Sequence, residues 1–195
     1  MQKLLALFAF LALSQMAFAQ LEIRPQVGVN SSTLTKDISL GSFDSDQGLQ
    51  FGADLIIGNR FYVQPGIMWE SVKNRIQPGG EDEELNFKIN RVRVPLLVGY
   101  KIFPSETGRY FNIRLFTGPN ASFAINKDVE DNNLSFDKDD IKGSVFGWNA
   151  GAGLDIAVLF VDFGYTFGLS DVFKGLDGNP RNNLFYANGG LRIRF

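Results

Sequence analysis

Apolar and polar residues alternate one by one in eight segments of the chain. In the last, Phe185, Ala187, Leu191, Ile193 and Phe195 share one parity, and polar residues or glycine fill most of the positions between them. A period of two indicates a β-strand with one apolar and one polar face. The other predicted strands are Leu21–Asn30, Gly48–Gly58, Phe61–Asn74, Leu85–Phe103, Arg109–Asn126, Gly143–Ile156 and Leu159–Asp171. The pattern predicts an all-β fold.

One of these segments changes parity along its length. In residues 85–103 the apolar side chains occupy odd positions at first and even positions later, and the change falls at Asn90 and Arg91. One extra residue in this strand has that effect, so we predict a β-bulge there.

The connections between the segments alternate between short and long. The short ones are Asn59-Arg60, Pro104–Gly108 and Ala157-Val158, and the long, polar ones are Ser31–Gln47, Arg75–Glu84, Lys127–Lys142 and Val172–Asn182. This alternation is typical of an antiparallel up-and-down outer-membrane barrel, with periplasmic turns and external loops. An even number of strands places both ends of the chain on the periplasmic side.

Volume indicates which face of the sheet points inward. A soluble barrel would enclose its apolar face. Here that face carries on the order of forty side chains, whereas eight strands enclose little more than a filled core. The polar face is rich in glycine, which suits a narrow lumen. We therefore predict an eight-stranded transmembrane barrel with its apolar face toward lipid and aromatic residues near both interfaces.

The first residues have the features of a secretory signal peptide. Lys3 precedes the apolar run Leu4–Leu13, and Ala17-Phe18-Ala19 is a small-x-small cleavage pattern before Gln20. The apolar run is shorter than the roughly 20 residues of a spanning helix, which disfavours a retained anchor. We predict a cleaved signal peptide over residues 1–19 and a barrel domain over residues 20–195.

Composition narrows the possible chemistry. The chain has no His and no Cys, and its formal net charge is −2. Ser–His and Cys–His catalysis, His-ligated metals and disulfides are therefore excluded. No phosphate-binding loop, dinucleotide fingerprint or basic nucleic-acid patch is present. We expect a protein that is not an enzyme, needs no cofactor and does not bind nucleic acid.

Charged residues on the polar face form the first candidate site. Those predicted to point into the lumen are Glu22, Arg24, Asp54, Glu70, Arg91, Arg93, Lys101, Arg114, Asp155, Asp162, Arg192 and Arg194. Confined charges must pair and hydrogen-bond, because unpaired burial is costly. We interpret this set as a closed polar plug, with a narrow basic pore as the alternative.

Acidic runs in the long connections form the second candidate site. Residues 81–84 are all acidic, and Asp137, Asp139 and Asp140 cluster in a later loop. A solvated surface is the usual role of such runs. The alternative is Ca²⁺ or Mg²⁺ bound between these carboxylates and anionic lipopolysaccharide or a partner. The cluster lacks the glycine and the distal glutamate of an EF-hand.

Several segments together resemble a known family. They are IRPQVGVNSS, YVQPGIMWE, VRVPLLVGYKI, FTGPNASFAIN, WNAGAGLDI and NGGLRIRF. The chain resembles the PorT-type outer-membrane β-barrel domain of Bacteroidetes, and more broadly small barrels of the OmpX and OmpA kind. The resemblance implies an outer-membrane location and an aromatic carboxy-terminus, Phe195, that is read by the barrel assembly machinery. It supplies no catalytic residues.

Three roles remain open. We favour an envelope or surface protein that interacts through its long loops or periplasmic rim. The PorT resemblance implies a component of the type IX secretion apparatus as an alternative, and the lumen charges leave a narrow pore as another.

Overall fold

The computed structural model describes residues 20–34, 41–45, 47–78, 85–103, 110–130, 144–170 and 182–195. Its strands are β1 (Leu21–Leu34), β2 (Gly41–Ser45), β3 (Gln47–Gly58), β4 (Phe61–Pro78), β5 (Leu85–Lys101), β6 (Phe111–Glu130), β7 (Ser144–Ile156), β8 (Leu159–Gly168), β9 (Asn182–Leu191) and β10 (Ile193–Arg194). Within these ranges no helix is long and apolar enough to cross a membrane. The predicted signal peptide, the Pro104–Gly108 turn and the acidic residues 81–84 and 137–140 lie outside them.

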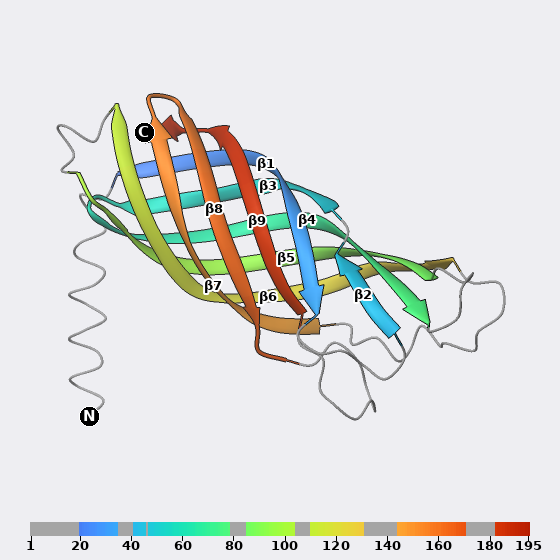
Figure 1. The fold of residues 1–195 in the computed structure, drawn as a ribbon. Helices are drawn as coiled ribbons and strands as arrows, with labels where there is room; N and C mark the ends of the chain where they lie inside the picture. The colour runs from blue at the N-terminus through green and yellow to red at the C-terminus, as the bar shows by residue number, and fades with distance from the viewer. Residues whose placement is uncertain are drawn as a thin grey trace, which may run out of the picture.

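The sheet closes on itself as an antiparallel barrel. Neighbours in sequence pair from β3 to β9, and β1 pairs with β3 on one side and with β9 and β10 on the other (Figure 1). We call β9 and β10, residues 182–194, the terminal barrel strand, because they continue each other across Arg192. With β2 set aside as an addition to the far end of β4, eight strands make the barrel. The predicted fold class is confirmed.

Short turns gather at one end of the barrel. Asn59-Arg60 joins β3 to β4, and Ala157-Val158 joins β7 to β8. The chain ends meet there too, since the Phe195 N–H donates to the Leu21 carbonyl at 2.9 Å. We call this the short-turn end and the opposite one the long-loop end.

Strands at the long-loop end run further than the alternation indicates. β1 continues to Leu34, β4 to Pro78 and β6 to Glu130, and β2 occupies residues predicted as loop. Those loop boundaries were wrong. Strand pairing needs backbone hydrogen bonds rather than an apolar face, so beyond the membrane a polar sequence can extend the sheet. β8 ends at Gly168, earlier than the predicted Asp171.

The predicted bulge is present at the predicted position. The register between β5 and β6 shifts between Asn90 and Arg91. Asn90 faces Asn126 and Arg91 faces Ala124, so the extra residue is Ile125. The inserted residue therefore belongs to β6 rather than to β5, which corrects the strand assignment.

Exposure confirms which face is outside. The apolar side chains of Val27 and Phe61 are 67% and 77% exposed, whereas Arg24 and Arg114 are 0% exposed. A soluble barrel would show the reverse. The outer face also carries aromatic pairs, with Phe61 and Tyr100 ring centroids 4.9 Å apart near the short-turn end.

Glycines make room for the large rings of the interior. Tyr62 points inward directly opposite Gly99, and a methyl group at Gly99 would overlap the Tyr62 ring. Three further facing pairs share this arrangement: Phe116 with Gly151, Phe160 with Gly190 and Tyr186 with Gly164. The glycine-rich polar face thus lets eight strands enclose aromatic side chains.

Candidate functional site: the lumen

The structure places most of the predicted charges inside the barrel. The buried residues are Glu22, Arg24, Asp54, Glu70, Arg91, Arg93, Lys101, Arg114, Asp155, Asp162 and Arg192. Arg194 lies at the rim, with its side chain 29% exposed. Phe195 is exposed at the carboxy-terminus. Asp137, Asp139 and Asp140 are not among the described residues.

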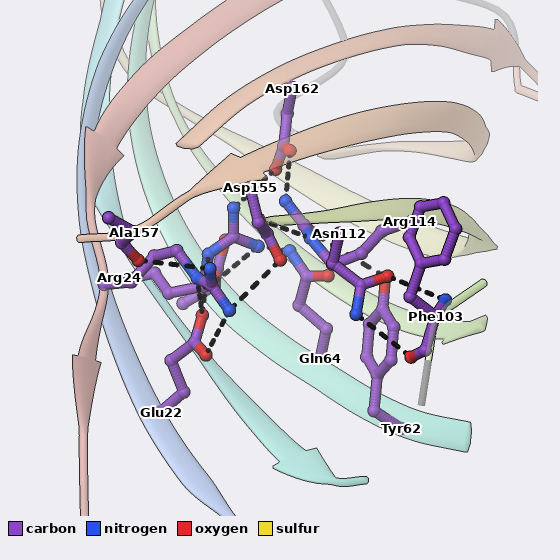
Figure 2. Close-up of polar contacts among 12 residues, drawn as sticks. Glu22, Arg24, Tyr62, Gln64, Phe103, Asn112, Arg114, Asp155, Ala157 and Asp162 are labelled. Carbon is purple, nitrogen blue, oxygen red and sulfur yellow. Dashed lines mark hydrogen bonds and ion pairs between the residues drawn. The ribbon is translucent and has the colours of Figure 1, made fainter. Parts of the chain in front are cut away.

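Six of these residues form a closed ring of ion pairs in the short-turn half. In order, with the signs alternating, they are Glu22, Arg192, Asp155, Arg114, Asp162 and Arg24, which pairs again with Glu22. We call this set the charge ring, and Figure 2 shows its dashed contacts converging in the lumen. Its members come from β1, β6, β7, β8 and Arg192 of the terminal barrel strand. One ionic circuit therefore ties five barrel strands together.

Arg192 holds one side of the ring. Its Nε and Nη2 atoms donate to the two Glu22 carboxylate oxygens at 2.9 and 3.1 Å. Its Nη2 also lies 3.2 Å from Asp155 Oδ2, and Asp155 Oδ1 accepts from Arg114 Nε at 2.9 Å. The planar fork of the guanidinium makes such two-atom contacts specific as well as strong.

Arg24 and Asp162 complete the other side. Asp162 accepts from Arg114 Nη2 through one oxygen and from Arg24 Nη2, at 3.1 Å, through the other. Arg24 Nε lies 3.6 Å from Glu22 Oε1. The Arg24 guanidinium also stacks 3.5 Å from the centroid of the Phe160 ring. A desolvated cation over an aromatic face is stabilised by the ring quadrupole.

In the long-loop half, amides and hydroxyls bond one another around an ion pair, in which Arg93 Nε lies 3.4 Å from Glu70 Oε2. Asn149 Oδ1 accepts from Asn120 Nδ2 and from Thr166 Oγ1, both at 2.7 Å. Gln50 donates to Asn188 and accepts from Arg93 Nη2 at 3.1 Å. Sequence reasoning did not single out these amides, although their parity places them on the lumen face.

An apolar layer also contributes to the interior. Leu97, Phe116, Leu184 and Tyr186 form a buried cluster. Ile56 and Phe160 are buried as well, at 0% and 2% exposure. The predicted polar plug is therefore only part of the interior, because apolar residues with the lumen parity were overlooked among more frequent polar ones.

Small cavities lie between the packed side chains of the described lumen. One, of about 20 Å³, lies among Asp54, Arg93, Phe116 and Tyr186, and another, of about 30 Å³, is bordered by Glu70, Arg91 and Arg93. A water molecule needs roughly 10–15 Å³ of such volume, whereas ligand pockets measure about 300–1,000 Å³. These cavities have room for one or two waters each and for no organic ligand. In the described part of the chain, no three His, Cys, Asp or Glu side chains are grouped to hold a metal ion.

A closed antiparallel sheet with an apolar exterior and an ionic interior defines a transmembrane β-barrel. Residues 14–174 match the family model described as outer membrane protein beta-barrel domain, and the chain belongs to that family. It is a protein of the bacterial outer membrane. The narrower resemblance to PorT-type barrels stays a prediction.

Three solved structures are similar to the chain at low identity. Neisserial surface protein A is 12% identical, with a TM-score of 0.49 over 90% of this chain and 97% of its own. Ail of Yersinia pestis is 14% identical, with a TM-score of 0.43 over 88% and 98%. The N-terminal beta-barrel domain of Pseudomonas aeruginosa OprF is 9% identical, with a TM-score of 0.43 over 89% and 97%. No curated protein matches.

Proposed function

We propose that the protein is a non-enzymatic envelope barrel whose filled lumen serves as a rigid membrane anchor and whose long-loop end contacts partners. The observation that carries this proposal is the packed lumen. The charge ring, the apolar cluster and the amide network leave cavities of about 20 and 30 Å³ in the described interior. A pore would need a continuous water-filled path, and nothing in the site favours the secretion-apparatus alternative.

Conductance tests the plug directly. Pure protein in a planar bilayer is expected to give no stable open channel, because ion passage would require several buried ion pairs to separate. A porin inserted at the same protein-to-lipid ratio is the positive control. Steady anion conductance by this barrel would overturn the plug and favour the basic pore.

The sheet beyond the membrane supports the surface role. β4, β5 and β6 contain 18, 17 and 20 residues, whereas a transmembrane strand needs about 9–11. Their pairing continues to Ile76↔Leu85 and Asn86↔Glu130, and β2 adds to the end of β4 (Figure 1). An extended sheet of this kind offers backbone and side chains to a partner.

Removal of this extension tests the surface role. Ser71 and Asn90 face each other across β4 and β5, so an Asn-Gly turn can replace residues 72–89 with hairpin geometry. The shortened barrel is expected to fold, which is checked by its heat-modifiable migration in detergent gels. In proximity labelling at the cell surface, it is expected to label fewer neighbouring proteins than the full barrel does. Unchanged labelling would exclude the extension as the contact site.

Divalent cations remain part of the proposal for the acidic connections. Calorimetric titration with CaCl₂ separates this alternative from a solvated surface: uptake that is lost when Asp137, Asp139 and Asp140 are changed to Asn would favour cation binding, because hard cations bind carboxylate oxygens. Equal heats for both proteins would leave these residues as a solvated surface.

A further inference from the structure

The pairing of β1 with the terminal barrel strand, which we call the seam, is interrupted near the short-turn end. Ile23 pairs with Ile193 and Gln26 with Gly190 in one register, but Arg24 and Pro25 have no partner in the ladder. The Phe195 N–H donates to the Leu21 carbonyl across this seam. In an antiparallel strand, every second residue directs its N–H and C=O to the same neighbour, so residues 21, 23 and 25 all face the terminal barrel strand. Residue 25 is a proline and has no N–H to donate. The seam therefore lacks a backbone hydrogen bond at Pro25.

Like charges face each other at the same place. The register that pairs Ile23 with Ile193 sets Arg24 opposite Arg192. Like charges directly opposite each other destabilise an antiparallel pair. Both side chains are buried, at 0% and 5% exposure, so water screens their repulsion poorly. The barrel therefore closes at a point where a backbone hydrogen bond is missing and two buried arginines repel each other.

One carboxylate offsets both effects. Glu22 binds Arg192 through two hydrogen bonds, and Arg194 Nε lies 3.2 Å from its Oε2 atom. On its own strand, Glu22 lies 3.6 Å from Arg24. The other carboxylates of the charge ring, Asp155 and Asp162, connect these arginines to β7 and β8 instead.

We propose that Glu22 is the latch of the seam: its carboxylate neutralises the arginines gathered there and holds β1 to the terminal barrel strand where the backbone ladder is broken. Glu22 is thus a positioning residue for barrel closure rather than one of six equivalent members of the charge ring. Loss of its charge should loosen the seam before the rest of the sheet.

Site-resolved amide hydrogen exchange distinguishes these two roles. Glu22→Gln is expected to speed exchange of the seam amides Ile23 and Ile193 by about tenfold or more relative to Lys101, because local opening is governed by local contacts. The Lys101 N–H donates to the Arg60 carbonyl at the same end, away from the seam. Equal acceleration at all three amides would overturn the proposal.

Asp162→Asn is the matched control. It also removes one buried carboxylate. Asp162 has two arginine partners where Glu22 has three, and the partners of Asp162 lie on β1 and β6. Arg24 loses one carboxylate in this variant but keeps Glu22, and Arg192 keeps both Glu22 and Asp155. The variant is therefore expected to speed exchange at Ile23 and Ile193 less than Glu22→Gln does. Selective loosening of the seam to the same degree as in Glu22→Gln would show that Glu22 has no special role.

A double variant keeps the test decisive if Glu22→Gln does not fold. Glu22→Gln combined with Arg192→Gln removes the carboxylate together with the arginine that faces Arg24. It is expected to recover folded barrel, or seam protection, relative to Glu22→Gln alone. No recovery would contradict a latch that works by neutralising opposed arginines.

Discussion

The two halves of the lumen are held together by different chemistry. In the short-turn half, six charged side chains alternate in sign around a closed ring. In the long-loop half, amides such as Asn149 and Gln50 exchange neutral hydrogen bonds, and the charges there form an ion pair between Arg93 and Glu70 rather than a ring. Buried ion pairs are strong when complete and very costly when one partner is lost, whereas neutral bonds cost less to lose.

This difference between the two halves matches where the backbone pairing at the seam is continuous and where it is interrupted. From Gln26↔Gly190 to Leu34↔Asn182 the seam ladder is unbroken, and there amides suffice. At Arg24 and Pro25 the ladder is interrupted, and there the ring places its charges. Side-chain charge therefore substitutes for backbone pairing where the barrel closes, and the two halves should differ in their sensitivity to mutation.

Arg114→Met should have the largest effect. Arg114 is 0% exposed and binds both Asp155 and Asp162, so its loss leaves two buried carboxylates short of a partner. We expect a loss of about 3–5 kcal/mol in the free energy of unfolding, measured by urea titration in lipid vesicles. Arg60→Met, an exposed arginine at the same end, is the control and should change it by no more than about 0.5 kcal/mol. Similar losses in both variants would show that the ring does not stabilise the barrel.

Gly99→Ala should have the next largest effect. The added methyl group would overlap the Tyr62 ring, whose hydroxyl lies 3.5 Å from Arg114 Nη1. Overpacking of this kind costs about 1–3 kcal/mol. Gly189→Ala is the control, because its nearest neighbouring atom would lie 3.8 Å away. If both substitutions are tolerated equally in urea titration, the interior is looser than its packing indicates.

Most of the fold could be predicted from the sequence. The alternation of residues such as Val27 and Gln26 shows which side chains share a face. Because the interior of a narrow barrel is small, only the polar face can point inward. The position of the register shift at Asn90 and Arg91 was also predicted, although the extra residue lies in β6 and not in the strand whose parity changes. Strand ends in the long-loop region, such as Pro78, were not predictable, because polar strands outside the membrane show no amphipathic alternation.

The pairings within the lumen could not be predicted. Parity alone shows that Arg24 and Asp162 point inward, but their contact at 3.1 Å depends on how far the strands are staggered around the barrel. The inward orientation of apolar residues such as Phe160 could have been predicted, since Phe160 has the same parity as Asp162 on its strand. The charge ring is thus a property of the register rather than of any motif.

Asn149→Leu tests the neutral half and should cost less than Arg114→Met. The substitution leaves the Asn120 amide and the Thr166 hydroxyl without their common acceptor. Each unsatisfied neutral group costs about 1–3 kcal/mol, less than a buried charge that loses its partner, and urea titration resolves the loss. A loss equal to that of Arg114→Met would erase the proposed difference between the two halves.

Phe195→Ala should change the folded barrel least. The ring is 75% exposed, and the backbone N–H that bonds Leu21 is retained, so the unfolding free energy should fall only by the lipid contact of one ring, as much as in Phe61→Ala. If the assembly machinery reads the terminal aromatic, the amount of folded barrel in cell outer membranes should nevertheless fall severalfold. Phe61→Ala is the matched control, since Phe61 is 77% exposed at the same end. Equal yields from the two variants would mean that Phe195 acts as an ordinary lipid-facing aromatic and carries no separate assembly signal.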